Sequence, residues 1–245
     1  MSSSGMKMSR IQPWLIFLIL CAVGFAEPPR DVFPAEPTGY CSKYSDPFDA
    51  FNPERWQEVL LFSKARTTVR VADGSLRLET VPDDPCEAQV YSLFMFRGDF
   101  DIQTDYEVVG GDGLKACRFN AGLVFQTPGD ELSYKFYIAA SGKDHFLFRA
   151  RRDLLGEQNQ ETYKAACGAP RGCLRVKREG SRISFLAKDG NDWRKVYAFD
   201  GLHEERMRLR FKLQTSDQEE GGKLCPVVVK FDNFIVHTCE AILNE

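Results

Sequence analysis

Hydrophobic and polar residues alternate along short segments of this chain. In residues 99–108, one set of alternate positions is mostly apolar or aromatic. The other set consists of Asp99, Asp101, Gln103, Asp105 and Glu107. Because successive side chains of a strand point to opposite faces, this pattern predicts a strand with one buried face. Asp73-Gly74, between alternating segments at 67–71 and 75–80, predicts a hairpin.

Similar segments, separated by turn residues, recur to the end of the chain. The expected strands are 67–71, 75–80, 89–96, 99–108, 118–126, 133–139, 145–151, 173–178, 182–188, 193–199, 207–215 and 227–236. Residues 154–166 are expected to form a short helix or a loop, and residues 203–206 one helical turn. Many short strands with regular turns predict an all-β fold, an antiparallel sandwich or barrel.

The first 26 residues have the composition of a secretory signal peptide. Lys7 and Arg10 precede an apolar run from Trp14 to Phe25, and Gly24 and Ala26 supply the small residues of a cleavage site. The run is shorter than the roughly 20 apolar residues that span a membrane, although a retained anchor is the alternative. Cleavage would leave an extended lead-in, 27–44, and a single domain, 45–240. This domain would be secreted, periplasmic or on the cell surface, with no stable membrane span.

Cysteine usage agrees with export. The chain has eight cysteines, and in an oxidising compartment some of those beyond the signal peptide should pair. We expect a bridge between Cys167 and Cys173, which enclose a short loop, and one between Cys41 and Cys239, which would tie the ends of the domain together. Seven cysteines follow the cleavage site, so at least one thiol stays unpaired or intermolecular. Zinc is not expected, because the chain has no Cys-x-x-Cys.

Charge limits the classes of partner. The formal net charge is −3, and a mildly acidic chain is a poor candidate for binding nucleic acid or an anionic membrane. No feature of the sequence specifies a protein partner.

Several longer segments follow one another in a familiar order. They are SDPFDAFNPERW (45–56), VADGSLRLET (71–80), RGDFDIQTDYEV (97–108), AGLVFQ (121–126), SYKFYIAASGKDHFLFRARRD (133–153), CLRVKREGSRISFLAKDGNDWRKV (173–196) and KFDNFIV (230–236). This order resembles the concanavalin A-like lectin/glucanase superfamily, especially the laminin-G-like jelly rolls of secreted bacterial proteins. The resemblance implies a two-sheet antiparallel jelly-roll sandwich, often with a ligand groove on its concave sheet. It implies no single function, because members include sugar-binding modules, glycoside hydrolases and adhesion domains.

Hydrolysis of a glycoside requires two positioned carboxyl groups. The family 16 glucanases of this superfamily carry the pattern Glu-x-Asp-x-x-Glu, and this chain contains no Glu-x-Asp. The nearest substitute is the acidic set Asp99, Asp101, Asp105 and Glu107, which we interpret as the solvated face of a strand. Catalysis is therefore not the first expectation, and no catalytic residue is assigned.

Alternation favours a ligand-binding face instead. In segments 118–126, 133–139 and 145–151, one set of alternate residues is apolar and is expected to be buried. If these strands are neighbours, the opposite set lines one surface with Asn120, Gln126, Lys135, Tyr137, Arg149 and Arg151. Amide, tyrosine and guanidinium groups suit hydroxyl-rich or carboxylated ligands, an acidic glycan above all. An ordinary exposed sheet face is the alternative.

The expected function is therefore that of a secreted, non-catalytic, lectin-like domain that recognises a glycan or surface polymer. A glycoside hydrolase or lyase with a non-standard site is one alternative, and a structural or adhesion module that binds protein is another. Trp56 and Trp193 are expected to pack in the core or at a sheet edge. No cofactor is expected, although the resemblance implies that Asp46, Asp49 and Asp232 could hold a structural calcium ion. The alternative for these three residues is the capping of turns.

Overall fold

The computed structural model describes residues 39–61, 67–81, 85–142, 145–154, 160–188, 190–204, 206–215 and 223–244. Contacts divide the chain into residues 1–33 and residues 34–245, and only the second unit contains described residues. The expected signal peptide and the lead-in up to residue 38 lie outside the described residues. Among the helices that the structure describes, none is long and apolar enough to cross a membrane.

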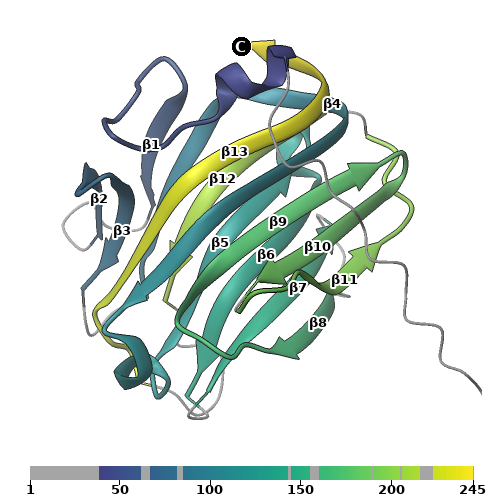
Figure 1. The fold of residues 1–245 in the computed structure, drawn as a ribbon. Coiled ribbons are helices and arrows are strands. Elements are labelled where there is room, and N and C mark those ends of the chain that lie inside the picture. The colour runs from purple at the N-terminus through teal and green to yellow at the C-terminus, as the bar shows by residue number, and fades with distance from the viewer. Residues whose placement is uncertain are drawn as a thin grey trace, which may run out of the picture. The chain divides into compact units, whose positions relative to one another are not determined.

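Antiparallel strands make up most of the described chain (Figure 1). They are β1 (Trp56–Leu61), β2 (Thr67–Ala72), β3 (Ser75–Thr80), β4 (Glu87–Val109), β5 (Arg118–Gln126), β6 (Leu132–Ser141), β7 (Phe146–Leu154), β8 (Glu161–Ala166), β9 (Arg171–Glu179), β10 (Arg182–Lys188), β11 (Arg194–Phe199), β12 (Arg206–Gln214) and β13 (Val227–Asn244). Short 3-10 helices occur at η1 (Gly39–Tyr44), η2 (Gly111–Leu114) and η3 (Pro128–Asp130).

The long strand β4 belongs to two layers. Its first half pairs with β1 and β12, and the order β1-β4-β12-β5-β6-β7-β8 forms one layer, here called sheet A. Its second half pairs with β13 and β9, and the order β2-β3-β13-β4-β9-β10-β11 forms the other, here called sheet B. In Figure 1, sheet B lies in front and sheet A behind it. This arrangement is an antiparallel sandwich, as the strand pattern predicts, and the jelly roll that the family resemblance implies.

Aromatic side chains join the two layers. The rings of Phe100 in sheet B and Phe125 in sheet A stack with 5.1 Å between their centroids. Phe136 of sheet A and Phe185 of sheet B are also 5.1 Å apart. Both pairs come from the apolar set of alternate positions, and their burial in one cluster explains the alternation in the sequence.

The segment before β1 packs against the last strand. Trp56 is 1% exposed and packs on Phe94, Phe211 and Phe234, so the expectation of core packing is confirmed. Its indole nitrogen donates a 2.8 Å hydrogen bond to Asp46.

The disulfides confirm one of the two expected pairings. Cys41 and Cys239 are bridged, which ties the segment before β1 to β13. Cys117 pairs with Cys225, which the sequence did not suggest. The predicted Cys167–Cys173 bridge is wrong, because neither cysteine forms a disulfide in the structure. Cys167 lies within 3.5 Å of the hydroxyl of the inward-facing Tyr106, whereas Cys173 shares the outer face of sheet B with its register partner Asp105.

Three expected elements differ in the structure. Segments 89–96 and 99–108, predicted as separate strands, are parts of the single strand β4. In the described part of segment 154–166, Leu154 ends β7 and Glu161–Ala166 form the strand β8, while residues 155–159 lie outside the described residues. Residues 201–204 have no helical turn.

Candidate functional site

All six residues of the predicted ligand-binding face lie on the outer side of sheet A. Strands β5, β6 and β7 are neighbours, as the prediction required. Their register places Tyr137 beside Arg149 and Lys135 beside Arg151, while Gln126 and Asn120 lie on β5. Whether these side chains bind a ligand stays a prediction.

Strand β12 extends this face with three more basic residues, which our sequence analysis did not single out. Arg208, Arg210 and Lys212 alternate with the core residues Met207, Leu209, Phe211 and Leu213. They lie opposite Gln126, Val124 and Gly122 of β5. The alternation in MRLRFKLQ indicates that these three basic residues share one face of a strand. Only the non-local pairing of β12 with β5 places that face beside the other strands.

We call this surface the sheet A face. It comprises Gln89 of β4, Arg208, Arg210 and Lys212 of β12, Asn120, Gly122, Val124 and Gln126 of β5, Lys135 and Tyr137 of β6, Arg149 and Arg151 of β7, and Lys164 of β8. Glu87 and Asp153 lie at its margins on β4 and β7. One row across the strands runs Gln89–Lys212–Gly122–Tyr137–Arg149–Lys164.

Glycine is required at the centre of this row. A Cβ atom at Gly122 would lie 2.1 Å from the carbonyl oxygen of Phe136, so the backbones of β5 and β6 approach too closely for any other residue. The absence of a side chain at Gly122 also leaves Lys212 and Tyr137 as the neighbours on either side in the row.

Several polar atoms of the sheet A face are buried without a hydrogen-bond partner. They are Gln89 Oε1, Asn120 Oδ1, Gln126 Oε1 and the hydroxyl oxygen of Tyr137. Tyr137 is 3% exposed and lies outside the main core cluster, and burial raises its pKa above the ordinary value. Buried polar groups normally have partners, so a cluster of unpartnered ones indicates a place where a polar ligand could supply them.

The two carboxylates at the margins of this face are held by cations. Glu87 forms an ion pair with Lys212, with 2.7 Å between Oε2 and Nζ. Burial lowers the pKa of Lys212, and the charge of Glu87 opposes that effect. Asp153 pairs with both Lys135 and Arg151. The face is therefore basic, although the whole chain carries a slight negative charge.

Two hollows open on the sheet A face. A pocket of about 540 Å³ lies over β7 and β8, lined by Arg149, Arg151, Gln160, Thr162, Tyr163 and Lys164. A smaller one of about 150 Å³ lies beside Gln126, Arg208 and Arg210, next to the η3 turn. Arg210 there pairs with Asp130 at 2.9 Å, and its guanidinium group lies 4.2 Å from the ring centroid of Tyr91.

The acidic set on β4 lies on the other side of the sandwich, on the outer face of sheet B. The prediction that this set is solvated is wrong for Asp101. Its side chain is 2% exposed, and Arg175 donates two hydrogen bonds to it, of 2.7 and 2.6 Å. This pair forms because β9 runs beside β4, which alternation alone could not predict. Asp99 accepts a hydrogen bond from the backbone of Gly180, and Glu107 pairs with Lys230.

Near that ion pair, His237 contacts Gln103, with 2.7 Å between Nε2 and Oε1. Burial lowers the pKa of His237, the neighbouring Arg175 lowers it further, and Asp101 raises it. Trp193 is half-buried and directly precedes the edge strand β11, and the guanidinium group of Arg175 lies 5.5 Å from its ring centroid.

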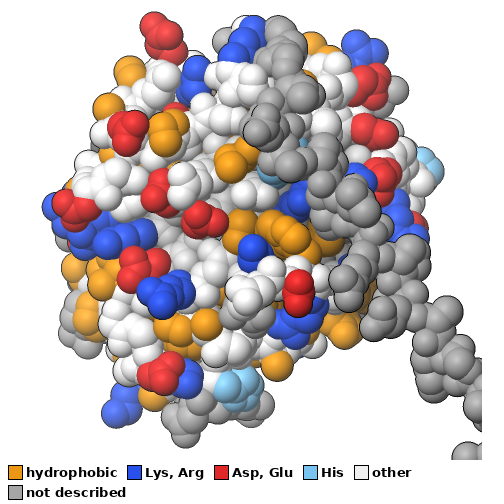
Figure 2. All heavy atoms as spheres, in the orientation of Figure 1, with side chains coloured by type: hydrophobic (Ala, Val, Ile, Leu, Met, Phe, Trp, Pro, Cys, Tyr) orange, Lys and Arg blue, Asp and Glu red, His pale blue; other side chains and the backbone are white. Residues whose placement is uncertain are grey.

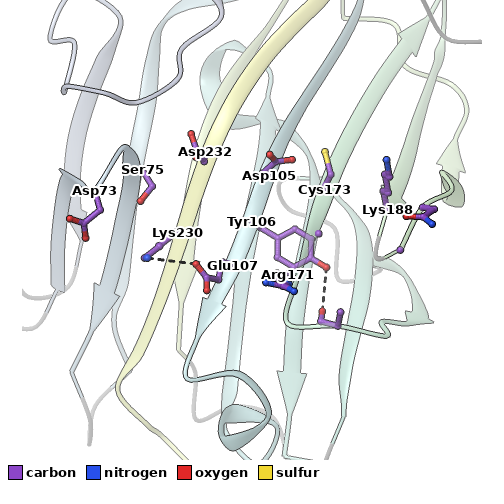
Figure 3. Close-up of a pocket in the computed structure, with 14 residues that line it drawn as sticks. Asp73, Ser75, Asp105, Tyr106, Glu107, Arg171, Cys173, Lys188, Lys230 and Asp232 are labelled. Carbon is purple, nitrogen blue, oxygen red and sulfur yellow. Dashed lines mark hydrogen bonds and ion pairs between the residues drawn. The ribbon is translucent and has the colours of Figure 1, made fainter. Parts of the chain in front are cut away.

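A pocket of about 800 Å³ also lies on sheet B (Figure 3). Asp105 of β4 and Asp232 of β13 lie directly opposite each other in it. Burial raises the pKa of Asp232, a backbone hydrogen bond from Asn233 opposes this, and Asp105 and Asp49 raise the pKa further. Figure 2 shows acidic and basic side chains interspersed over this side of the molecule.

The aspartates considered for calcium do not converge as one site. Both carboxylate oxygens of Asp46 are occupied, by the backbone of Phe48 and by the indole of Trp56, each at 2.8 Å. Among the described residues, no group of three or more acidic, histidine or cysteine side chains could hold a metal ion. The residues present therefore do not fit a calcium ion.

Comparisons with known proteins identify the fold. No protein family model and no curated protein sequence matches the chain. Among solved structures, a β-glucanase of Bacillus licheniformis has a TM-score of 0.58 at 15% identity, covering 79% of this chain and 96% of that one. A glycoside hydrolase family 16 endo-glucanase of Bacteroides ovatus has a TM-score of 0.58 at 11% identity, covering 81% and 99%. A pseudo β-1,3-glucanase of Mycobacterium tuberculosis has a TM-score of 0.58 at 10% identity, covering 82% and 98%.

At these identities the likeness concerns the fold. The chain has the concanavalin A-like jelly-roll fold, as the order of its sequence segments implies.

Proposed function

We propose that this protein is an exported, non-catalytic glycan-binding protein and that the sheet A face is its binding surface. The observation that carries the proposal is the set of buried polar atoms without partners, on Gln89, Asn120, Gln126 and Tyr137. They come from β4, β5 and β6 of one layer. Sugar hydroxyl groups can donate hydrogen bonds to the three amide oxygens and can either donate to or accept from the tyrosine hydroxyl group. The two disulfides support export to an oxidising compartment.

The carboxylates of the sheet A face support binding rather than hydrolysis there. Glu87 on β4 and Asp153 on β7 are four strand positions apart in the order β4-β12-β5-β6-β7. At about 4.8 Å per strand, this is roughly 19 Å along the sheet, whereas glycosidase carboxyl groups lie about 5–10 Å apart. Both carboxylates are also held by cations, so neither is placed to donate a proton. The comparison with a protein named a pseudo β-1,3-glucanase supports a non-hydrolytic role for this fold.

Titration calorimetry with a panel of neutral and acidic polysaccharides tests this proposal, with reducing-sugar release measured on the same mixtures. We expect binding of at least one glycan class and no release of reducing ends. Binding to no glycan at high protein concentration would contradict the proposal and favour a structural or adhesion module.

A glycoside hydrolase is the second candidate function, and a specific observation favours it. Asp105 and Asp232 face each other across adjacent strands in the sheet B pocket, and burial raises the pKa of Asp232, as a proton donor requires. Solved structures of the same fold include glucanases. If reducing ends are released by the wild type and not by Asp105→Asn or Asp232→Asn, the hydrolase is correct and the binding proposal is wrong.

A further inference from the structure

The pocket over β7 and β8 has an unusual charge composition. Of the six described residues that line it, Arg149, Arg151 and Lys164 are basic and none is acidic. The other three, Gln160, Thr162 and Tyr163, can exchange hydrogen bonds with hydroxyl groups. Among the described residues, no carboxylate pairs with Lys164, which is exposed on the edge strand β8.

The positive charge continues from this pocket across the sheet A face. In the antiparallel register, Lys212, Tyr137, Arg149 and Lys164 follow one another in one row. Arg210, Lys135 and Arg151 follow one another in the next row. From β12 to β8 these rows cross four strand spacings, about 19 Å, so they could contact several sugar residues of an extended chain.

Among the described residues, the basic side chains of these rows outnumber the carboxylates that pair with them. Asp153 forms ion pairs with both Lys135 and Arg151. Glu87 pairs with Lys212, and Asp130 pairs with Arg210. Lys164 adds a further cation at the β7–β8 end. The excess of positive charge is concentrated where the pocket opens.

We propose that the glycan bound by the sheet A face is acidic and that its carboxylate groups occupy the pocket over β7 and β8. This inference rests on the proposed function, because it names the class of ligand for the same surface. A guanidinium group matches a planar carboxylate with two parallel hydrogen bonds, and two arginines here lie side by side on one strand face. The sugar hydroxyl groups are contacted by Tyr137 and the amides of the same face.

The experiment compares three polysaccharides by titration calorimetry at low and high salt. The probes are polygalacturonate, which carries carboxylates, the neutral β-glucan laminarin, and dextran sulfate. We expect polygalacturonate to bind at least tenfold more tightly than laminarin and dextran sulfate at low salt, and to weaken as salt rises because the charges are screened.

Variants locate the site. Arg151→Gln should weaken polygalacturonate binding by about tenfold, the effect of losing a charge-assisted hydrogen bond. Lys164→Gln, on an exposed position where folding is not at risk, should weaken it severalfold. Arg182→Gln, an exposed arginine of sheet B that pairs with Asp200, is the matched control and should leave the affinity unchanged.

The possible failures are distinguishable. Equal or tighter binding of laminarin would overturn the acidic ligand while leaving glycan binding intact, and a preference for dextran sulfate would overturn the assignment to carboxylate. If the protein bound neither these three polysaccharides nor any other glycan of the panel, the proposed function itself would be overturned. Unchanged affinity in both Arg151→Gln and Lys164→Gln would remove the pocket from the site.

Discussion

At the scale of single residues, Tyr137 separates a binding role from a structural one. Its hydroxyl group is buried without a partner, so it contributes desolvation cost without a compensating hydrogen bond. A buried hydroxyl group that costs stability is better explained by a role in binding a ligand than by a role in stabilising the fold.

Tyr137→Phe should therefore leave the free energy of unfolding unchanged or raise it by up to about 1 kcal/mol. The same change should weaken glycan binding about two- to tenfold, because one neutral hydrogen bond is lost. Urea denaturation and calorimetry measure the two effects. Tyr197→Phe, at an exposed tyrosine of sheet B, is the control and should alter neither. A loss of stability at unchanged affinity would show that the hydroxyl group is structural.

Asp101 illustrates the opposite case, a charged group that serves the fold. Replacing it by Asn would leave Arg175 without its carboxylate in a buried site, so the free energy of unfolding should fall by about 3 kcal/mol or more. Glu107→Gln removes a more exposed partner on the same strand, with 3.6 Å to Lys230, and should cost less than about 1 kcal/mol. Equal effects in urea denaturation would mean that the Asp101–Arg175 pair does not stabilise the sandwich.

Sequence alternation predicted which way these side chains point but not their surroundings. It placed Tyr137 and Arg149 on one face correctly, because facing depends only on local periodicity. It did not predict the burial of Asp101, because its partner Arg175 is 74 residues away in the sequence.

At the scale of elements, β4 connects the two layers. Its pairing with β12 ends at Arg97 and its pairing with β9 begins at Phe100. Gly98 lies between them with a φ of 69°, a left-handed conformation that glycine adopts without strain. The sequence Arg97-Gly98 looks like a break between strands, so the prediction divided this element in two.

Gly98→Ala should reduce the free energy of unfolding by about 1–2 kcal/mol, the cost of the left-handed conformation for an L-residue. The added Cβ would also displace the flexible side chain of Glu240. Gly113→Ala is the matched control, because a Cβ there meets nothing within 4 Å and its φ is not left-handed. Similar thermal unfolding of both variants would contradict this role for Gly98.

Strand β12 shows why the site was only partly predictable. Its alternation is as clear as that of β6, yet its neighbours in the sheet come from β4 and β5, far away in the sequence. The prediction thus found the local half of the basic face, on β6 and β7, and missed Arg208, Arg210 and Lys212.

At the scale of the whole molecule, two disulfides connect distant parts of the chain. Cys41–Cys239 spans 198 residues and Cys117–Cys225 spans 108. Cross-links that close long loops restrict the unfolded chain and typically contribute about 2–4 kcal/mol each.

Replacing both Cys41 and Cys239 by Ala should therefore lower the thermal unfolding temperature clearly while the fold is retained. Alkylation of the unfolded but unreduced protein should label Cys86, Cys167 and Cys173, the described cysteines that form no disulfide. A peptide in which Cys167 is bridged to Cys173 would contradict the structure.

The central claim is that the sheet A face binds a glycan without cleaving it. The most direct measurement is a crystal structure of the protein with the polysaccharide fragment that binds most tightly in calorimetry. The account predicts an intact sugar chain across β12, β5, β6 and β7, in contact with Tyr137 and Arg149. A sugar in the sheet B pocket between Asp105 and Asp232, above all a cleaved one, would contradict it.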